Sequence, residues 1–233
     1  MNSFFSRYLK EIVFGGNDGI VTTFAVVAGF SGATMSESSL VQLSFLSVLL
    51  FGAANLFADG SSMGLGNYLS EKSSIQNYKS LKQEQLALIN DHSVILEKDT
   101  AKLLLENGIK GDNAKTILLM FRKHKAFWVD FLMNYKLKER NPENINPKIS
   151  GITTSLSFII FGFIPLIPFI IFPTNPNNFI FSIIGTVIAL ILLGSFRAII
   201  VEKDKIKSIT EVLLVGSFAS LGAFLIGTIF SRL

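Results

Sequence analysis

The chain of 233 residues is 49% hydrophobic and only 16% charged, which is too apolar for an ordinary soluble domain. It contains no cysteine, so disulfides, thiolate metal sites and cysteine nucleophiles are excluded. The net charge of +4 does not indicate nucleic-acid binding, because the basic residues lie beside apolar segments. The composition therefore predicts an all-α, polytopic membrane protein.

The amino-terminal residues 2–13 combine apolar and charged side chains with the spacing of a helix. The apolar side is rich in phenylalanine, and Arg7, Lys10 and Glu11 fall on the polar side. This pattern predicts a short amphipathic helix that lies in the membrane interface before the chain enters the bilayer. The stretch lacks the uninterrupted apolar region of a cleavable signal peptide, so none is expected.

A first membrane span is predicted from about Ile12 to Ala33, where the side chains are apolar apart from Asn17, Asp18 and a few hydroxyl residues. Asn17 and Asp18 lie beside glycines near one face of the membrane. Such a pair indicates either a helix end that Asp18 caps or a functional site. The spacing alone leaves both interpretations open.

The second span is predicted from about Leu40 to Leu69, after a turn over residues 31–39, and is long enough to extend past the bilayer. Its second half places Asp59 among apolar residues. An ionised carboxylate in hydrocarbon costs about 3 kcal/mol or more, so Asp59 should face a partner or a watery cavity. Polar and thioether side chains three and four residues apart share its helical face: Asn55, Asp59, Ser62, Met63 and Asn67.

This stripe suggests the lining of a metal-ion pathway. The thioether of Met63, one turn from the carboxylate of Asp59, combines soft and hard donor atoms, which favours transition metals over Na⁺ or Ca²⁺. The alternative is a packing face on which Gly60 and Gly64 let two helices approach closely. The residues alone are compatible with both interpretations.

A hydrophilic insert over residues 71–148 separates the second span from the third. Three stretches of it show helical periodicity: 81–96, 100–106 and 113–138. We expect a compact three-helix domain, because its apolar stripe needs burial. The chain then divides into residues 1–70 with two spans, the insert, and residues 149–233 with the remaining spans.

The insert carries ten acidic and fourteen basic residues, and this net positive charge opposes a role as a cation reservoir. Most of its charged side chains are therefore expected to form a solvated surface. Four of its residues offer at most a weak metal site: Glu71, Glu84, His92 and Glu97.

Three further spans are predicted at about residues 152–172, 179–200 and 212–230. Pro165 and Pro168, one turn apart, should kink or break the third span and free backbone carbonyls that tertiary packing absorbs. The fifth span carries small residues that suit close helix packing or a dimer seam: Gly216, Ser217, Ser220, Gly222 and Gly227.

Lysine and arginine are distributed unevenly over the connecting segments. The turns at 31–39 and 173–178 contain neither, whereas the insert and the segment after the fourth span are rich in both. Because positively charged loops stay in the cytoplasm, we expect the amino terminus and residues 71–148 there, and the carboxyl terminus on the other side. Short loops and the lack of targeting features favour a bacterial inner membrane.

Two motifs resemble one known family. The segments EIVFGGNDGIVTTFAVVAGFSGA (11–33) and LFADGSSMGLGNYLSEKSS (56–74) are similar to the first two membrane helices of the vacuolar iron transporter family and its bacterial relatives. The five spans, the interfacial helix and the helical insert match as well, so the resemblance covers essentially the whole chain. It implies a homodimeric, proton-coupled exporter of Fe²⁺ or related metals, with Asp18 and Met63 lining the metal path at the dimer interface.

The sequence also departs from the pattern of that family. Asn55 stands where many members carry a glutamate, and Asp59 stands where they carry a glycine, which would restore a carboxylate one turn further along. Members that capture iron in the insert use clustered glutamates and a Met-Met pair. Here Leu132 precedes Met133, and Lys136 occupies a usual glutamate position. At these positions the insert lacks residues that those members use to bind metal.

The residues and the resemblance together predict an exporter of Fe²⁺ or Mn²⁺ that works by proton antiport. Asp18 and Asp59 would bind the dication, and the same carboxylates can exchange protons, because metal and proton compete for one group. Met63 would favour transition metals. Neutral oxygen donors or water-holding groups would come from Asn17, Asn55, Ser62 and Asn67. The metal is the substrate, and no cofactor is expected.

The expected partners are divalent metal ions, protons, the lipid bilayer and a second copy of the chain, without nucleic acid. The alternative function is a non-transporting membrane receptor or scaffold whose cytoplasmic domain binds a partner. An enzyme is not expected, since the chain has two histidines and no HExxH, GxSxG or phosphate-binding loop motif.

Overall fold

The computed structural model describes residues 3–33, 41–91, 93–139, 141–142, 145–173, 175–201 and 204–230. These segments are helical apart from turns and short connections, and none of them contains a strand. Five of the described helices are long and apolar enough to cross a membrane. The predicted all-α, polytopic class is confirmed.

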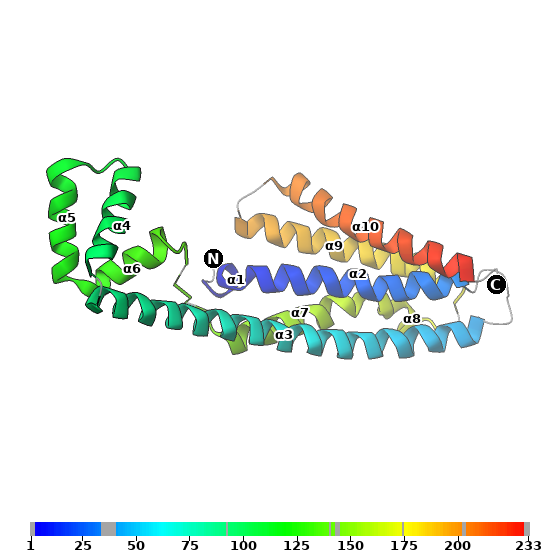
Figure 1. Cartoon of the computed structure of the whole chain (residues 1–233). Helices are drawn as coiled ribbons and strands as arrows, with labels where there is room; N and C mark the ends of the chain where they lie inside the picture. Colours follow the sequence, from blue (N-terminus) through cyan, green and yellow to red (C-terminus); the bar gives the residue numbers. More distant parts are fainter. Residues whose placement is uncertain are drawn as a thin grey trace. The chain divides into compact units, whose positions relative to one another are not determined.

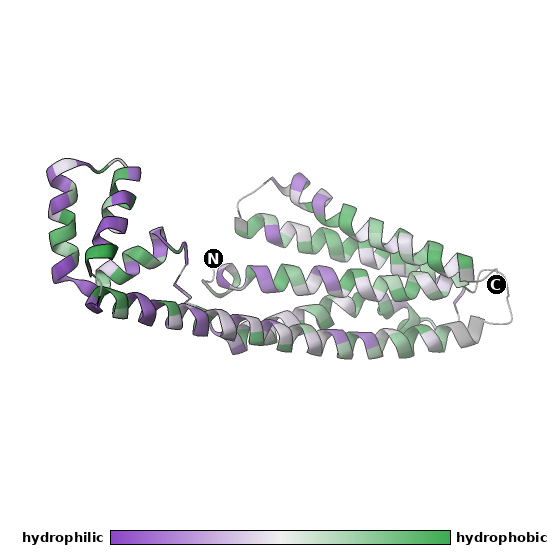
Figure 2. Cartoon of the chain, in the orientation of Figure 1, coloured by the Kyte–Doolittle hydropathy of each residue, from purple (hydrophilic) through white to green (hydrophobic). Residues whose placement is uncertain are grey.

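The chain forms two compact units. We call residues 1–69 and 147–233 the membrane unit and residues 70–146 the insert unit. The long helix α3 (Val41–Asp91) contributes to both (Figure 1). Hydrophobic residues dominate the helices of the membrane unit, whereas hydrophilic and hydrophobic residues are mixed along those of the insert unit (Figure 2).

Helix α2 (Leu9–Ala33) is the central helix of the membrane unit. The helices that follow the insert pack against it: α7 (Pro147–Gly162), α9 (Asn178–Val201) and α10 (Lys205–Phe230). Phe24 of α2 belongs to a core shared with α3 and α7, and Ile20 belongs to a second core shared with α9 and α10. The central position of α2 therefore decides where its polar residues can lie.

The close approach of α2 to α7 depends on glycines. A Cβ atom on Gly15 would lie 2.5 Å from the carbonyl oxygen of Thr154, and one on Gly19 would overlap the backbone of Phe158. From the other side, a Cβ atom on Gly162 would lie 2.7 Å from the carbonyl oxygen of Gly19. Lipid gives helices no hydrophobic reason to associate, so such backbone contacts stabilise the bundle through van der Waals packing.

The amino-terminal helix is shorter than the predicted one over residues 2–13. Helix α1 (Ser3–Arg7) ends before Tyr8, and α2 already begins at Leu9. The amide of Tyr8 donates to the carbonyl of Phe4 at 3.0 Å, which continues the helical hydrogen bonding across the junction. The first span therefore starts earlier than the hydropathy pattern predicts.

The third span is broken at its prolines, as predicted. Helix α7 is followed by a 3-10 turn, η2 (Ile164–Leu166), and a short helix, α8 (Ile167–Ile171). Pro165 and Pro168 interrupt the helix because they lack a backbone N–H. The buried hydroxyl of Ser182 on α9 donates a 2.8 Å hydrogen bond to the carbonyl oxygen of Pro165, so the packing satisfies a backbone group in the broken region.

In the insert unit, the predicted helix over 81–96 is wrong. Helix α3 extends to Asp91, and α4 (Ser93–Glu106) begins two residues later. The stretch 100–106, which periodicity predicts as a separate helix, belongs to α4. Gly108 follows the end of this helix, and its φ of +84° lies in the left-handed region that glycine favours. His92, a candidate ligand, lies outside the described residues.

The third predicted helix of the insert is two helices, α5 (Gly111–Lys123) and α6 (Lys125–Tyr135). Between them, His124 leaves helical geometry with a φ of −121° and a ψ of 67°. The bend lets the rings of Phe121 and Trp128 stack with centroids 6.1 Å apart in one buried core. Burial of both apolar faces accounts for the break, which periodicity alone does not reveal.

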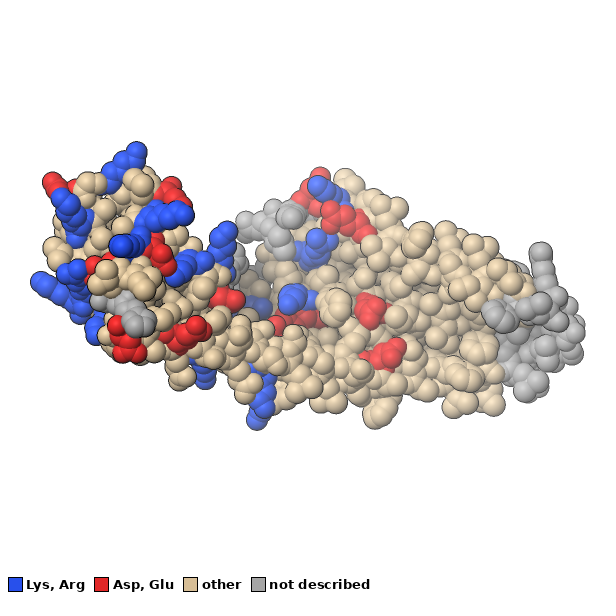
Figure 3. Space-filling view, viewed as in Figure 1, with Lys and Arg blue, Asp and Glu red and all other residues tan. Residues whose placement is uncertain are grey.

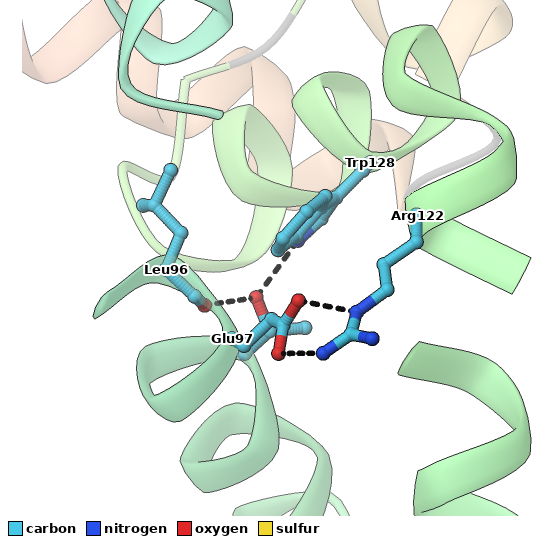
Figure 4. A network of polar contacts seen from close by, with 5 residues as sticks. Leu96, Glu97, Arg122 and Trp128 are labelled. Atoms are coloured by element: carbon cyan, nitrogen blue, oxygen red, sulfur yellow. Dashed lines mark hydrogen bonds and ion pairs between the residues drawn. The ribbon is translucent and has the colours of Figure 1, made fainter. Parts of the chain in front are cut away.

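Polar contacts join the helices of the insert unit (Figure 4). The indole of Trp128 donates to the hydroxyl of Thr100 at 2.8 Å, and that hydroxyl donates to the carbonyl of Leu96 at 2.6 Å. Beside them, the guanidinium of Arg122 donates to both carboxylate oxygens of Glu97, at 2.5 and 2.6 Å. The bidentate pair links α4 to α5.

Two further ion pairs link helices of this unit. Lys136 contacts Asp99 at 2.6 Å, and Lys82 contacts Asp130 at 2.7 Å. These bonds, like the one to Glu97, occupy carboxylates that a metal would otherwise require. Among the described residues no group of three or more His, Asp or Glu side chains comes together. In the described part of the insert unit, Glu97, Asp99 and Asp130 are thus paired with arginine or lysine.

Gly19→Ala should destabilise the membrane unit by about 1–3 kcal/mol, the usual cost of overpacking, because the added methyl group would overlap the backbone of Phe158. Thermal unfolding of the detergent-solubilised protein measures the effect. Gly66→Ala is the matched control, since a Cβ atom at Gly66 would have no described atom within 4 Å apart from its chain neighbours and the backbone of its own helix. A Gly19→Ala variant as stable as the wild type would contradict the described contact between α2 and α7.

The hydrogen bond and charge of Arg122 lower the pKa of Glu97 from its ordinary 4.5, against a smaller opposing effect of burial. Because the folded-state pKa is depressed, this pair stabilises the fold above the unfolded-state pKa and loses its effect as pH falls through the folded-state value. We expect Glu97→Gln to melt below the wild type at neutral pH, with the difference vanishing in acid well below pH 4.5. Glu106→Gln, at an exposed acid on the same helix, is the control. A difference independent of pH would count against the ion pair.

Candidate metal site

Two carboxylates lie within the membrane unit on neighbouring spans, Asp18 on α2 and Asp59 on α3. Both side chains are partly buried, and their charges are close enough to interact. Neither carboxylate forms a hydrogen bond or an ion pair within the described part of the chain. Like charges in apolar surroundings repel strongly unless a cation or a proton lies between them, so this pair is suited to bind one.

The position of Asp18 decides between its two predicted roles. It lies in the middle of α2, so the interpretation as a helix cap is wrong. Its backbone carbonyl accepts a 2.8 Å hydrogen bond from the hydroxyl of Thr22, within the same helix. The carboxylate is therefore not needed to end a helix.

Charged atoms are sparse on the visible face of the membrane unit, whereas lysine and arginine crowd the insert unit (Figure 3). Asp18 on α2 and Asp59 on α3 are two partly buried acids of this unit, which also contains the buried Glu11 on α2 and the ion-paired Glu211 on α10. Each carboxylate in hydrocarbon costs about 3 kcal/mol, so two of them need a compensating positive charge.

Both interpretations of the α3 stripe describe part of the structure. Gly60 and Gly64 do allow close packing, since a Cβ atom on Gly64 would lie 2.7 Å from the Cβ atom of Ser155 on α7. Met63 is partly buried against the core that contains Leu56 and Phe158. Within one chain, α3 thus packs on α7 through its glycines while Asp59 and Met63 stand beside that contact.

Asn67 points to α7. Its amide nitrogen donates to the hydroxyl of Ser150 at 2.9 Å and to the hydroxyl of Thr154 at 2.8 Å. The nitrogen is thereby used in helix packing, and this residue belongs to a polar network rather than to the pair of aspartates.

The other predicted neutral donors lie in separate places. Asn55 lines a groove of about 680 Å³ between α2, α3 and α10, and Asn17 lines a different hollow of about 580 Å³ beside Arg197 and Glu211. The Oδ1 atom of Asn17 and the Nδ2 atom of Asn55 are buried without a hydrogen-bond partner. Ser62 is exposed. One chain thus brings the two aspartates together but not the whole predicted set.

Glu11 is the residue that the sequence interpretation misses. Its expected place on the polar side of an interfacial helix is wrong, because it is only 6% exposed and its Oε1 atom accepts a 2.7 Å hydrogen bond from Ser150. The missed signal is its spacing: Glu11, Gly15 and Gly19 are four residues apart, so Glu11 shares the face of α2 that contacts α7.

Comparison with known proteins places the chain in a family. The family model described as "VIT family" matches residues 9–228. Vacuolar iron transporter 1 of Eucalyptus grandis is 31% identical over 217 residues, which cover 93% of this chain and 84% of the relative. Vacuolar iron transporter 1 of Arabidopsis thaliana is 30% identical, with 93% and 83% covered, and the vacuolar iron transporter of Plasmodium berghei is 28% identical, with 95% and 82% covered. The matches include both motifs and all five spans, and the chain belongs to the VIT family.

Proposed function

We propose that this protein exports Fe²⁺, or a related dication such as Mn²⁺, from the cytosol in exchange for protons. The observation that carries the proposal is the interacting pair Asp18 and Asp59, held on adjacent spans without a partner in the described chain. The relatives are named iron transporters, which supports iron as the class of substrate.

The two carboxylates provide a physical basis for antiport. A dication between them cancels both charges and removes the repulsion, and protons do the same when the metal leaves. Binding of metal therefore displaces protons, and binding of protons displaces metal. A proton gradient directed into the cytosol would then drive metal in the opposite direction.

Met63 provides a basis for selectivity. Its thioether follows Asp59 by one helical turn, and a soft sulfur donor favours transition metals over Ca²⁺ or Mg²⁺. The insert unit contributes no comparable donor set among its described residues, so we assign selection of the metal to the membrane unit.

We propose that the working unit is a homodimer. In their most apolar windows, the span on α3 is only 22% buried within the chain and the span on α10 only 17%, compared with 56% for α2. Two carboxylates and one thioether are too few ligands for a dication that has lost its water, because such ions take four to eight donors. A two-fold axis beside α3 would bring a second copy of Asp18, Asp59 and Met63 to the same site.

Charge distribution supports a cytoplasmic location for the amino terminus and the insert unit. Export from the cytosol agrees with that orientation, since metal would be taken up on the side that carries the insert. The bacterial inner membrane stays our prediction for the location of this chain.

Asp18→Asn and Asp59→Asn should each abolish metal-dependent proton flux in proteoliposomes, because one carboxylate cannot neutralise a dication or exchange both protons. Fluorescence quenching by Fe²⁺ or Mn²⁺, together with a pH-sensitive dye, measures both fluxes. Asp112→Asn, at an exposed acid of α5, should behave as the wild type. A wild-type protein that is correctly inserted but moves no metal would instead support the receptor or scaffold function.

Met63→Leu should keep the fold, since the two side chains have similar volumes. Loss of the sulfur should lower the preference for Fe²⁺ over Ca²⁺ by about tenfold, equivalent to about 1.4 kcal/mol. Competition between the two ions in the same flux assay gives this ratio. Met120→Leu, an exposed methionine of α5, is the control, and an unchanged ratio in Met63→Leu would remove methionine from the site.

A further inference from the structure

Glu11 is a buried acid that the proposed metal site does not use. Only 6% of it is exposed, and its Oε1 atom accepts a 2.7 Å hydrogen bond from the hydroxyl of Ser150. Its Oε2 atom is buried and has no hydrogen-bond partner. A carboxylate in this setting has one neutral hydrogen bond to offset the loss of its hydration, which is far less than an ionised group needs.

The hydrogen bonds around Glu11 all have their donors on the side of Asn67 and Ser150. The amide of Asn67 on α3 donates hydrogen bonds to the hydroxyls of Ser150 and Thr154 on α7. The hydroxyl of Ser150 in turn donates a hydrogen bond to Oε1 of Glu11. Thr154 donates to the backbone carbonyl of Ser150 at 3.0 Å. The network therefore presents hydrogens to Oε1 and leaves Oε2 as the free position.

The charged side chains on the helices around Glu11 do not form ion pairs with it in the described part of the chain. Arg7 on α1, Lys10 on α2 and Lys148 on α7 have exposed side chains, and Tyr68 on α3 is partly buried. On α9 and α10, Arg197 and Glu211 form an ion pair with each other at 2.9 Å. The remaining acids of the facing spans are Asp18 and Asp59. No described side chain forms an ion pair with Glu11.

A proton fits this position better than a dication. A metal ion requires several lone pairs, whereas the hydroxyl of Ser150 offers Glu11 its hydrogen. A proton on Oε2 removes the negative charge without any change in the bond at Oε1. Glu11 lies seven residues before Asp18, which places it on the same face of α2, two turns or about 10 Å away along the helix.

We propose that Glu11 carries the exported metal's counter-proton between Asp18 and the cytoplasm. An O–H bond forms at Oε2 when a proton arrives from the aspartate pair, and the same bond breaks when the proton leaves to the cytoplasmic side, so that Glu11 returns to its carboxylate. Ser150 and Asn67 are positioning residues that hold Oε1 through both states. The proposal rests on the antiport function proposed above.

The test compares Glu11→Gln with Glu211→Gln, whose acid is exposed and lies in the same unit. Proteoliposomes are loaded with a pH-sensitive dye, and Mn²⁺ flux is driven either by a metal gradient or by a pH gradient. In Glu11→Gln we expect metal-driven exchange of Mn²⁺ to persist while stimulation by the pH gradient and the accompanying proton flux are lost. Glu211→Gln should keep both. A wild-type ratio of protons to metal in Glu11→Gln would overturn the proposal.

Infrared spectroscopy of the same proteoliposomes gives a readout that does not need transport. On lowering the pH, the carbonyl band of a protonated carboxylic acid should grow in the wild type, and Glu11→Gln should lack one component of it. Ser150→Ala should keep that component but shift its frequency, because a hydrogen bond to Oε1 is gone. If the wild type transports no metal, the antiport function fails on its own. A band that Glu11→Gln leaves intact overturns the role of Glu11, even where a misfolded variant explains lost flux.

Discussion

The backbone contact between α2 and α7 is the constraint on which the rest of the membrane unit depends. Positions 15 and 19 of α2 require glycine, because a Cβ atom on Gly15 or Gly19 would overlap the backbone of α7. Once these two glycines face α7, helical geometry places Glu11 and Asp18 on nearly the same side, two turns apart. Acidic groups that would prefer water are thus held inside the bundle by packing that involves no charge. The cost of their burial is offset by van der Waals contact over the whole seam.

Helix α3 also packs on α7 through glycines and carries polar residues next to them. Gly60 and Gly64 pack on α7, and polar residues, Asp59 and Asn67, lie at the two ends of that contact. The charge of Asp59 is then near enough to act on Asp18, while Asn67 donates to Ser150 and Thr154 in the network of Glu11. A small-residue packing face and a polar pathway are therefore not rival descriptions of these spans. The glycines set the distance at which the polar groups can act together.

The sequence predicts this architecture well where the signal is local. Apolar length locates the five spans, Pro165 and Pro168 locate the break in the third, and Asp59 within an apolar stretch predicts a candidate site. The sequence does not predict which face of each helix points into the bundle, nor which residues far apart in the chain contact each other. Glu11 looks solvated because Arg7 and Lys10 are beside it, yet its partner Ser150 is 139 residues away. Periodicity likewise misses the bend at His124, since both flanking stretches share one apolar pattern and only the folded core requires the turn.

The ion pairs of the insert unit bear on where metal chemistry can occur. Arg122, Lys136 and Lys82 each hold a carboxylate on a neighbouring helix, which is the cross-linking that a bound dication would otherwise supply. A cation that binds one of these three carboxylates would have to displace its lysine or arginine and would gain little over the charge already present. In the membrane unit the opposite holds, because Asp18 and Asp59 have no basic partner among the described residues. Under the proposed function, affinity and selectivity therefore have to arise within the membrane, from few ligands and a low dielectric constant that strengthens each of them.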